Sequence, residues 1–168
     1  AVLYRPDTQN DAQTMNNSLI SYTEAAEGDH EAWLALASKL WPDTTPPELQ
    51  EEFMHLLLSS DEHAFFAKCP EQGTIGFVAV AIRHDYVEGA TTSPAGYLEG
   101  IYVEEAFRRA GVGRQLLALG EKWLFDKGCR QIGSDTWLDN QQSQAFHKRS
   151  GFREEAVLVH YLKEIIRD

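Results

Sequence analysis

A short basic turn carries the residues of this chain that are best suited to hold an anion. Arg108, Gly111, Gly113 and Arg114 lie between an apolar run at 97–103 and a segment with helical spacing. The first backbone amides of a helix have no partner within the helix and carry partial positive charge. Glycines let phosphate groups approach those amides, and the arginines add charge. The pattern therefore indicates a site for a pyrophosphate.

Two common glycine motifs do not account for this turn. The dinucleotide fingerprint needs a third glycine where the chain has Leu116, and the nucleotide-hydrolase loop needs a Gly-Lys-Ser/Thr triplet that the turn lacks. What remains, Arg108-x-x-Gly111-x-Gly113, resembles the (Arg/Gln)-x-x-Gly-x-(Gly/Ala) acetyl-coenzyme A motif of the GCN5-related N-acetyltransferases. Taken alone, the turn is equally well explained as a strand-to-helix corner in which glycine serves only the backbone.

Apolar periodicity predicts alternating strands and helices around the turn. The strands are expected at 19–23, 63–68, 74–83, 97–103, 130–136 and 156–162. The helices are expected from a cap at Asp29 to Trp41, from a cap at Thr45 through Leu57, from the glycine turn to a stop at Gly128, and after a cap at Asp139 or Asn140. Gly100, inside the strand at 97–103, marks a bulge or a close backbone approach.

A second segment supports the family resemblance. The run from Asn140 through Ala145-Phe146-His147 to Gly151-Phe152 resembles the closing motif of the same acetyltransferases, and the order of elements is similar to theirs from about residue 17 to 166. The resemblance implies an α/β fold with a mixed central sheet, splayed at a β-bulge and flanked by helices. The strands on either side of the third helix are expected to be parallel neighbours. We expect one acetyltransferase domain at 15–168, preceded by an extension at 1–14.

Composition narrows the class of protein. Acidic residues outnumber basic ones by 26 to 15, a formal net charge of −11, which argues against a nucleic-acid binder and suits a cationic partner. The two cysteines show no metal spacing, and free thiols in the cytoplasm are the simple interpretation. His30-Glu31 begins a zinc-protease motif, but residue 34 is Leu34 rather than a second histidine. No metal is expected.

Carboxylates and aromatic residues alternate along the segments that would form the acceptor side. They are Trp41, Asp85, Tyr86, Glu88, Glu99, Asp135, Trp137 and Asp139. Carboxylates can pair with the ammonium groups of a polyamine sugar while rings cover its apolar faces. For each residue taken singly, core packing of an aromatic or a solvated loop for an acid explains it about equally well.

Several stretches resemble the aminoglycoside 6′-N-acetyltransferases in particular. They are Leu40-Trp41-Pro42-Asp43, Tyr86-Val87-x-Gly89…Ser93-Pro94, Leu98-Glu99-Gly100-Ile101-x-Val103 and Ser134-Asp135…Leu138-Asp139-Asn140. By position, the resemblance implies substrate contacts at Trp41, Tyr86, Glu99, Asp135 and, more loosely, Glu155. It implies acetyl-coenzyme A contacts at Ile101, Tyr102, Val103, Arg109, Ala110, Gly111, Val112, Gly113, Arg114 and Asn140. It also implies antibiotic resistance as the outcome and a homodimer as the assembly.

The expected reaction is direct transfer of acetyl to a primary amine, because no cysteine lies in a nucleophile motif. Asp135 is expected to orient the amine and accept its proton, Glu99 chiefly to bind, and a backbone N–H near Ile101 or Tyr102 to hold the thioester oxygen. His147 stands where the family often has a general-acid tyrosine, and a surface position is the favoured interpretation for it. Two alternatives stay open: an acetyltransferase for a polyamine or a protein N-terminus, and a non-catalytic module that binds coenzyme A.

Overall fold

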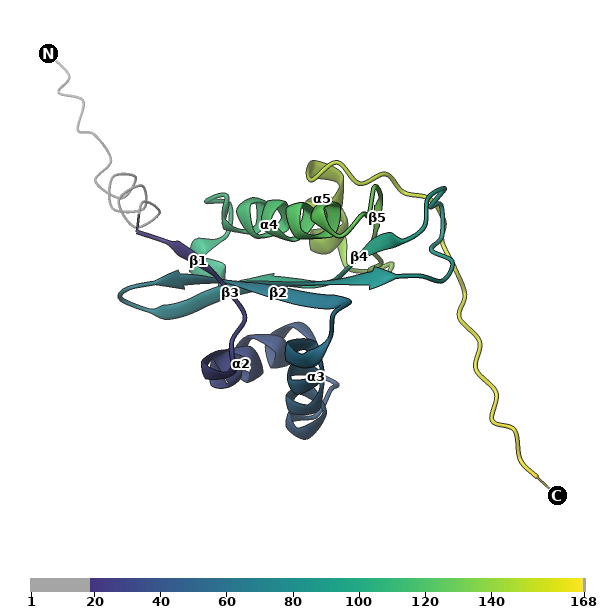
Figure 1. Cartoon of the computed structure of the whole chain (residues 1–168), viewed down its shortest axis with the longest axis horizontal. Coiled ribbons are helices and arrows are strands. Elements are labelled where there is room, and N and C mark those ends of the chain that lie inside the picture. The colour runs from purple at the N-terminus through teal and green to yellow at the C-terminus, as the bar shows by residue number, and fades with distance from the viewer. Residues whose placement is uncertain (1–18, 168) are drawn as a thin grey trace, which may run out of the picture.

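A five-stranded sheet forms the middle layer of the molecule. The computed structural model describes residues 19–167, and its strands neighbour one another in the order in which the sequence supplies them. Figure 1 shows the sheet edge-on between two helical layers. They are β1 (Ser21–Glu24), β2 (Glu62–Cys69), β3 (Gly73–Arg83), β4 (Ala95–Val103) and β5 (Ile132–Gly133). The first four are antiparallel, whereas β4 and β5 are parallel, as expected for strands joined through a helix.

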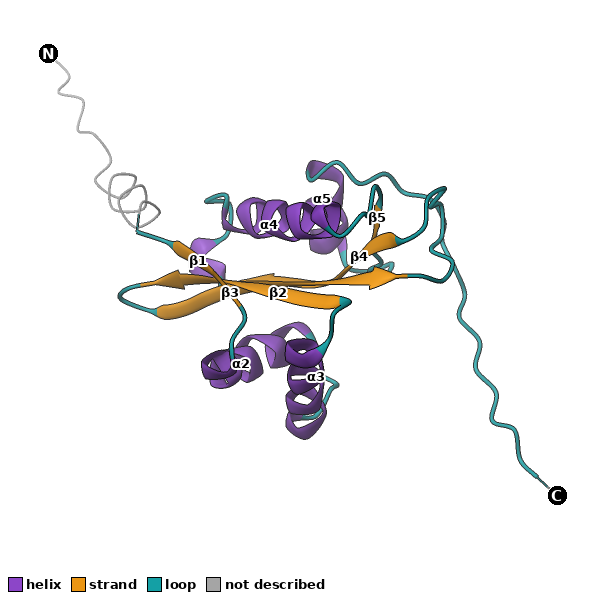
Figure 2. Cartoon of the chain, viewed as in Figure 1, coloured by secondary structure: helices purple, strands orange, loops and turns teal. Residues whose placement is uncertain are grey.

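Helices cover both faces of the sheet, as Figure 2 shows. The lower layer holds α2 (His30–Leu40) and α3 (Pro46–Leu58), and the upper layer holds α4 (Val112–Asp126) and α5 (Gln141–Arg149). Two single-turn 3₁₀ segments, η1 (Glu27–Asp29) and η2 (Glu105–Phe107), precede α2 and α4. The predicted α/β class with a mixed sheet between helices is confirmed.

Each helical layer has its own apolar core against the sheet. Val78 and Val80 of β3 pack in the cluster under α4, whereas Phe77 and Ala79 pack in the cluster over α2 and α3. Successive side chains of a strand point to opposite faces, so one central strand supplies both cores. The indole N–H of Trp33 donates to the Leu49 carbonyl oxygen at 3.0 Å, which ties α2 to α3.

Local signals in the sequence locate most of the helix ends. Glu48 accepts hydrogen bonds from the backbone N–H and the hydroxyl of Thr45, so the predicted capping box at the start of α3 is confirmed. Asp29 precedes α2 without capping it, because its carboxylate accepts from the Ala26 N–H and pairs with Lys68 at 2.6 Å. Asn140 caps α5 by accepting from the Ser143 N–H at 3.0 Å.

The last part of the chain differs from the prediction. The strand expected at 130–136 is reduced to Ile132–Gly133, and the strand expected at 156–162 is wrong. Residues 153–167 extend away from the sheet and belong to no helix or strand (Figure 1). The alternation of apolar residues suits a strand, but a strand forms only beside a partner strand, and the tail pairs with none of the five strands of the sheet. The predictions for residues 1–14 and Met15 lie outside the described residues.

Candidate functional site

The centre of the candidate site is the point where β4 and β5 diverge, which we call the fork. Their last paired residues are Tyr97 and Gly133. Just beyond, the register of β4 against β3 shifts, leaving Glu99 as the extra residue of a bulge. At Gly100 a Cβ atom would lie 2.5 Å from the ring of Trp41. The prediction that Gly100 marks a bulge and a close approach is confirmed, and the side chain that approaches is an indole.

A cleft of about 740 Å³ opens below the fork, between the sheet and the two lower helices. Among the predicted site residues, Trp41, Glu99 and Asp135 line it together. The remaining lining residues are Trp33, Thr44, Glu48, Glu51, Glu52, His55, Leu56, Glu62, Ala79 and Val80. The walls therefore hold two indole rings and six carboxylates, a combination that favours a bulky ligand with several positive charges.

The two predicted catalytic carboxylates belong to one bonded network. Glu99 accepts from the Arg83 guanidinium at 2.8 Å, and Arg83 also lies over the Tyr97 ring at 3.7 Å from its centre. The Tyr97 hydroxyl donates to Asp135 at 2.7 Å. Burial raises the pKa of Tyr97 far above its ordinary value, and the bond to Asp135 raises it further. Tyr97 therefore stays a donor, and it holds Asp135 at the edge of the cleft.

The carboxylates of α3 that line the cleft are not among the residues predicted from the sequence. Glu48, Glu51, Glu52 and His55 all line the cleft. Their spacing of three or four residues places them on one face of a helix, and this spacing is visible in the sequence. Such a pattern, however, is also typical of an ordinary solvent-exposed helix face. Burial raises the pKa of Glu52, and the charges of neighbouring carboxylates raise it further. That mutual repulsion is what a cation in the cleft would relieve.

On the other side of the sheet, the predicted phosphate turn opens α4. Gly111 precedes the helix with φ of 86°, a left-handed conformation, and open space surrounds its α-carbon. Gly111 stands at the N-cap position and has no side chain that could cap the first turn of α4, which suits the amides of that turn to a ligand. Arg109 and Arg114 are exposed, whereas Arg108 is turned inward and donates to the Val103 carbonyl oxygen at 2.8 Å. The turn fits a pyrophosphate.

A route leads from this turn to the fork along β4. Because β5 pairs only with Gly96 and Tyr97, the stretch from Ile101 to Val103 has no strand neighbour on that side within residues 19–167. Its backbone edge can therefore form hydrogen bonds with an extended ligand. The arm of coenzyme A, which carries amide groups, is an extended ligand of this kind. The Phe146 ring of α5 lies 3.3 Å from where a Cβ of Gly113 would stand, so α5 flanks the same route.

Other predicted residues lie outside the cleft walls. Tyr86 is 77% exposed on the β3–β4 loop, and Trp137 is 82% exposed after β5. Neither aromatic residue packs in the core. Glu155, on the tail, pairs with Arg153 and passes close to Gly89 of the β3–β4 loop. The roles of these residues as substrate contacts stay predictions.

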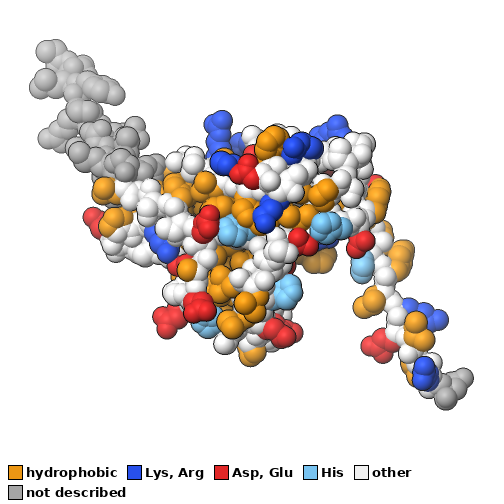
Figure 3. Space-filling view, viewed as in Figure 1, with side chains coloured by type: hydrophobic (Ala, Val, Ile, Leu, Met, Phe, Trp, Pro, Cys, Tyr) orange, Lys and Arg blue, Asp and Glu red, His pale blue; other side chains and the backbone are white. Residues whose placement is uncertain are grey.

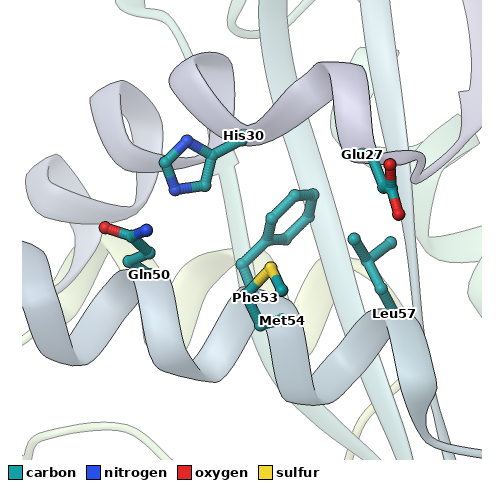
Figure 4. A pocket seen from close by; sticks show the side chains of 6 residues that line it. All are labelled: Glu27, His30, Gln50, Phe53, Met54 and Leu57. Atoms are coloured by element: carbon teal, nitrogen blue, oxygen red, sulfur yellow. The ribbon is translucent and has the colours of Figure 1, made fainter.

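A second, smaller hollow of about 410 Å³ lies between α2 and α3 and contains none of the predicted residues (Figure 4). Phe53, Met54 and Leu57 form its apolar part, and His30 and Gln50 point toward it from the two helices. It carries no charge arrangement comparable to that of the main cleft. Within residues 19–167 we find no cluster of three metal-ligating side chains, and no helix there could cross a membrane.

Comparison with known proteins places this geometry in a family. The chain matches the acetyltransferase (GNAT) family over residues 30–152. It is 39% identical to the aminoglycoside N(6′)-acetyltransferase type 1 of Stenotrophomonas maltophilia, over 82% of this chain and 89% of that protein. The protein of the same name from Serratia marcescens is also 39% identical, over 82% of this chain and 96% of its own length.

Solved structures agree. AAC(6′)-Iy, in complex with the bisubstrate analogue CoA-S-monomethyl-acetylneamine, superposes with a TM-score of 0.82 at 34% identity, over 87% of this chain and 99% of that one. AAC(6′)-Ih from Acinetobacter baumannii gives 0.81 at 35% identity, over 87% of this chain and 99% of its own. The fork, the glycine turn and these similarities together show that the chain belongs to the GNAT acetyltransferase family, as a relative of its aminoglycoside N(6′)-acetyltransferases.

Proposed function

We propose that this protein transfers acetyl from acetyl-coenzyme A to the 6′-amine of an aminoglycoside and thereby confers resistance to the antibiotic. The observation that carries the proposal is the cleft below the fork, where six carboxylates and two indole rings surround one space. An aminoglycoside presents several ammonium groups on rings with apolar faces, which match these two kinds of wall. The similar proteins are named N(6′)-acetyltransferases, and the choice of the 6′-amine as the acetylated group rests on those names.

The co-substrate enters from the opposite side of the sheet in this proposal. Gly111 and the uncapped first turn of α4 hold the pyrophosphate, and Arg109 and Arg114 add charge. The free edge of β4 from Ile101 to Val103 pairs with the pantetheine arm and leads it to the fork. A backbone N–H near Ile101 or Tyr102 faces the thioester oxygen and stabilises its developing charge.

Asp135 is the proposed base. Its carboxylate stands at the edge of the cleft, held by the Tyr97 hydroxyl at 2.7 Å, and can take a proton from the 6′-ammonium directly or through one water. Glu99 is held by Arg83 and contributes mainly to binding the amine. The neutral amine then attacks the thioester without a covalent enzyme intermediate. Both cysteines are buried, which supports this assignment.

A comparison of acceptors tests the proposal. Purified protein is given acetyl-coenzyme A and a kanamycin-type aminoglycoside, an analogue with hydroxyl in place of the 6′-amine, spermine, or a peptide with a free N-terminus. We expect turnover with the first alone, and product NMR should place the acetyl group on the 6′-nitrogen. Preferred turnover of spermine or peptide would replace the substrate class. Binding of coenzyme A without turnover of any acceptor would indicate a non-catalytic module.

A homodimer is the proposed assembly, and the C-terminal tail supports it. Seven large apolar residues of the tail are 64–95% exposed: Val157, Leu158, Val159, Tyr161, Leu162, Ile165 and Ile166. So much apolar surface on one arm indicates a partner surface. The outer edge of β5 has no strand neighbour within residues 19–167, so the tail of a second copy can pair there.

Sedimentation of the full chain tests the dimer. We expect Leu158→Lys combined with Leu162→Lys to shift the protein toward monomer, while Lys163→Ala leaves the assembly unchanged. A wild-type monomer at micromolar concentration would overturn the proposal.

Cytoplasmic location is proposed as well, on the ground that Cys69 and Cys129 are both free.

A further inference from the structure

The β3–β4 loop, residues 84–94, is fastened to the segment that carries Asp135. The side-chain amide oxygen of Gln131, one residue before β5, accepts hydrogen bonds from the backbone N–H groups of Thr91 and Thr92 at 2.7 and 2.9 Å. The hydroxyls of the same two threonines donate to this oxygen at 3.2 and 3.0 Å. Backbone N–H groups can only donate, so the oxygen of the Gln131 amide must face the loop. One side chain therefore gathers four donors of the loop.

A second attachment of the loop lies at Val87. This residue is 7% exposed and is the one buried residue between His84 and Ser93. A Cβ atom on Gly133 of β5 would lie 2.6 Å from a methyl group of Val87 and 3.2 Å from the ring of Tyr97. The two side chains therefore share the space over Gly133, and a glycine at this position of β5 leaves room for both.

Both attachments lie on the face of the segment that carries Asp135. Side chains at alternate positions of an extended segment point to one side, and Gln131, Gly133 and Asp135 are such positions. Ser134 points the other way, and its hydroxyl oxygen lies 2.8 Å from Nε2 of His147 on α5. His147 is half-buried there, so the sequence-based interpretation of it as a surface residue is wrong. The segment is thus held by α5 from one face, and by the loop and Tyr97 from the other.

The Tyr97 ring connects the loop to Asp135. Its hydroxyl donates to the Asp135 carboxylate at 2.7 Å. The guanidinium of Arg83 covers the ring at 3.7 Å from its centre, and Val87 borders the ring where both approach Gly133. A ring packed in this way keeps one rotamer, because the others need space that its neighbours fill. If the loop moved away, the ring could turn and its hydroxyl would leave Asp135.

We propose that Gln131 and Val87 are positioning residues for the acetyl transfer, because together they hold the β3–β4 loop where it keeps the Tyr97 hydroxyl directed at Asp135. The inference rests on the proposed function, in which Asp135 takes the proton of the amine. Neither Gln131 nor Val87 lines the cleft, so both act through Tyr97. Misplacement of a reacting group by about 1 Å can lower a rate by about 10²-fold, so a modest movement of Asp135 is enough to be measured.

The first test follows the loop without turnover. Hydrogen exchange of the Thr91 and Thr92 amides is measured by NMR in the wild type and in Gln131→Met, which keeps the length of the side chain but lacks the amide oxygen. We expect exchange to be about tenfold faster in this variant. Gln131→Glu offers a carboxylate to the same donors and should keep the slow exchange of the wild type. Gln72→Met, in the turn between β2 and β3 at the other end of β3, is the matched control. Equal exchange rates in all four proteins would overturn the inference.

The second test determines whether Gln131 acts through Tyr97. The single-turnover rate with a kanamycin-type aminoglycoside is measured at saturating substrates in Gln131→Met, in Tyr97→Phe and in the double variant. Gln131→Met should lower the rate about tenfold in the wild type but less than about twofold in Tyr97→Phe, because the hydroxyl that it positions is already absent. Gln131→Glu should keep most of the rate. Losses that add in the double variant would show that the loop supports the protein by another route, and would overturn the inference.

Val87→Ala separates the two attachments. The bonds of Gln131 stay in place, so exchange of the Thr91 and Thr92 amides should remain slow, but the space freed beside the Tyr97 ring should lower the rate severalfold. Unchanged rates in both Val87→Ala and Gln131→Met would overturn the inference and leave the proposed acetyl transfer standing. A wild type that acetylates none of the acceptors would instead overturn the proposed function, and this inference with it, so the two failures are distinguishable.

Discussion

The ligand sites proposed on the two sides of the sheet differ in the groups that they offer. On the α4 side, the backbone supplies the donors, and Gly111 leaves the approach to them open. On the α2 and α3 side, side chains line the cleft: carboxylates come from α3, β2, β4 and the segment after β5, and the indole rings come from Trp33 of α2 and from Trp41, which follows α2. In the view of Figure 3 most basic side chains lie over the upper layer and the sheet, whereas acidic ones lie over both layers. The proposed phosphate site therefore offers fixed backbone dipoles, whereas the proposed polyamine site offers negative charge.

This difference predicts how each side responds to substitution. A backbone site depends on a few positions where any side chain is an obstruction. A site made of many similar charges loses little when one is neutralised, unless that one takes part in the chemistry. Asp135 is the carboxylate that we propose to take part in the chemistry, so we expect its neutralisation to cause a large loss of activity.

Asp135→Asn should have the largest effect. The amide oxygen can still accept from the Tyr97 hydroxyl, so the local geometry is kept, but the base is lost. We expect kcat/KM for the aminoglycoside to fall by about 10²- to 10⁴-fold, the range for removal of a general base. Acetyl-coenzyme A affinity by calorimetry should not change. Asp139→Asn, in an exposed residue outside the cleft walls, is the control and should stay near wild type. Near-normal kcat/KM in the Asp135 variant would remove this residue from the mechanism.

Gly111→Val should have the next largest effect, on the other side of the sheet. The side chain would cover the amides of the α4 first turn, and each lost bond to a charged group is worth about 1.5–3 kcal/mol. We therefore expect acetyl-coenzyme A affinity to fall about tenfold or more. Gly128→Val is the matched control, because Gly128 also has left-handed backbone and open surroundings but lies at the far end of α4.

Both valine variants should lose about 1–2 kcal/mol of stability, the cost of a left-handed conformation for an L-residue. Only the Gly111 variant should lose affinity. Equal losses of affinity in the two variants would mean that strain in α4, rather than blocked amides, explains the effect.

The same contrast explains what the sequence could predict. The glycine turn could be predicted from the sequence because Arg108, Gly111 and Gly113 are close in sequence and form one local structure. The cap at Thr45, the bulge at Gly100 and the stop at Gly128 were readable for the same reason. Each of these features is decided by residues within one turn or one strand.

The carboxylates of α3 that line the cleft, and the course of the C-terminal tail, could not be predicted from local sequence patterns. Glu48, Glu51 and Glu52 look like an ordinary solvent face until the packing of α3 turns them into the cleft. The bond from Ser134 to His147 joins residues that only the β5–α5 packing brings together. The apolar alternation at 156–162 predicts a strand, but pairing depends on an edge that no local pattern specifies.

Glu52→Gln should have a smaller effect on function. Glu52 is one of six carboxylates in the cleft, and a single exposed ion pair is worth about 0.2–1 kcal/mol. We expect KM for the aminoglycoside to rise about 1.4- to 5-fold and to become less sensitive to salt, with little change in kcat. Glu121→Gln is the control, because burial also raises the pKa of Glu121, but it lies on α4 in the opposite layer. An unchanged KM would exclude Glu52 from substrate binding.

The smallest expected effect is on stability, and its sign depends on pH. Burial, together with the charges of Glu48, Glu62 and Glu99, raises the pKa of Glu52 in the folded state. The folded protein therefore binds this proton more readily than the unfolded chain, and stability falls as pH rises from the ordinary pKa through the raised one. Glu52→Gln should then stabilise the protein slightly at neutral pH, because solvent screens the charge of this exposed side chain, and it should make no difference below the ordinary pKa of a glutamate.

Glu48→Gln, on the same helix, should change the stability in the opposite direction. Hydrogen bonds from Thr45 lower the pKa of Glu48, so its contribution to stability is present above the ordinary pKa and is lost as pH falls through the lowered one. Urea unfolding at neutral pH should therefore find Glu52→Gln more stable than wild type and Glu48→Gln less stable. If both variants shifted in the same direction, the negative charge of the cleft would act only through the overall net charge. Opposite shifts would instead show that the fold holds Glu52 charged at a cost to stability, while the charge of Glu48 supports the start of α3.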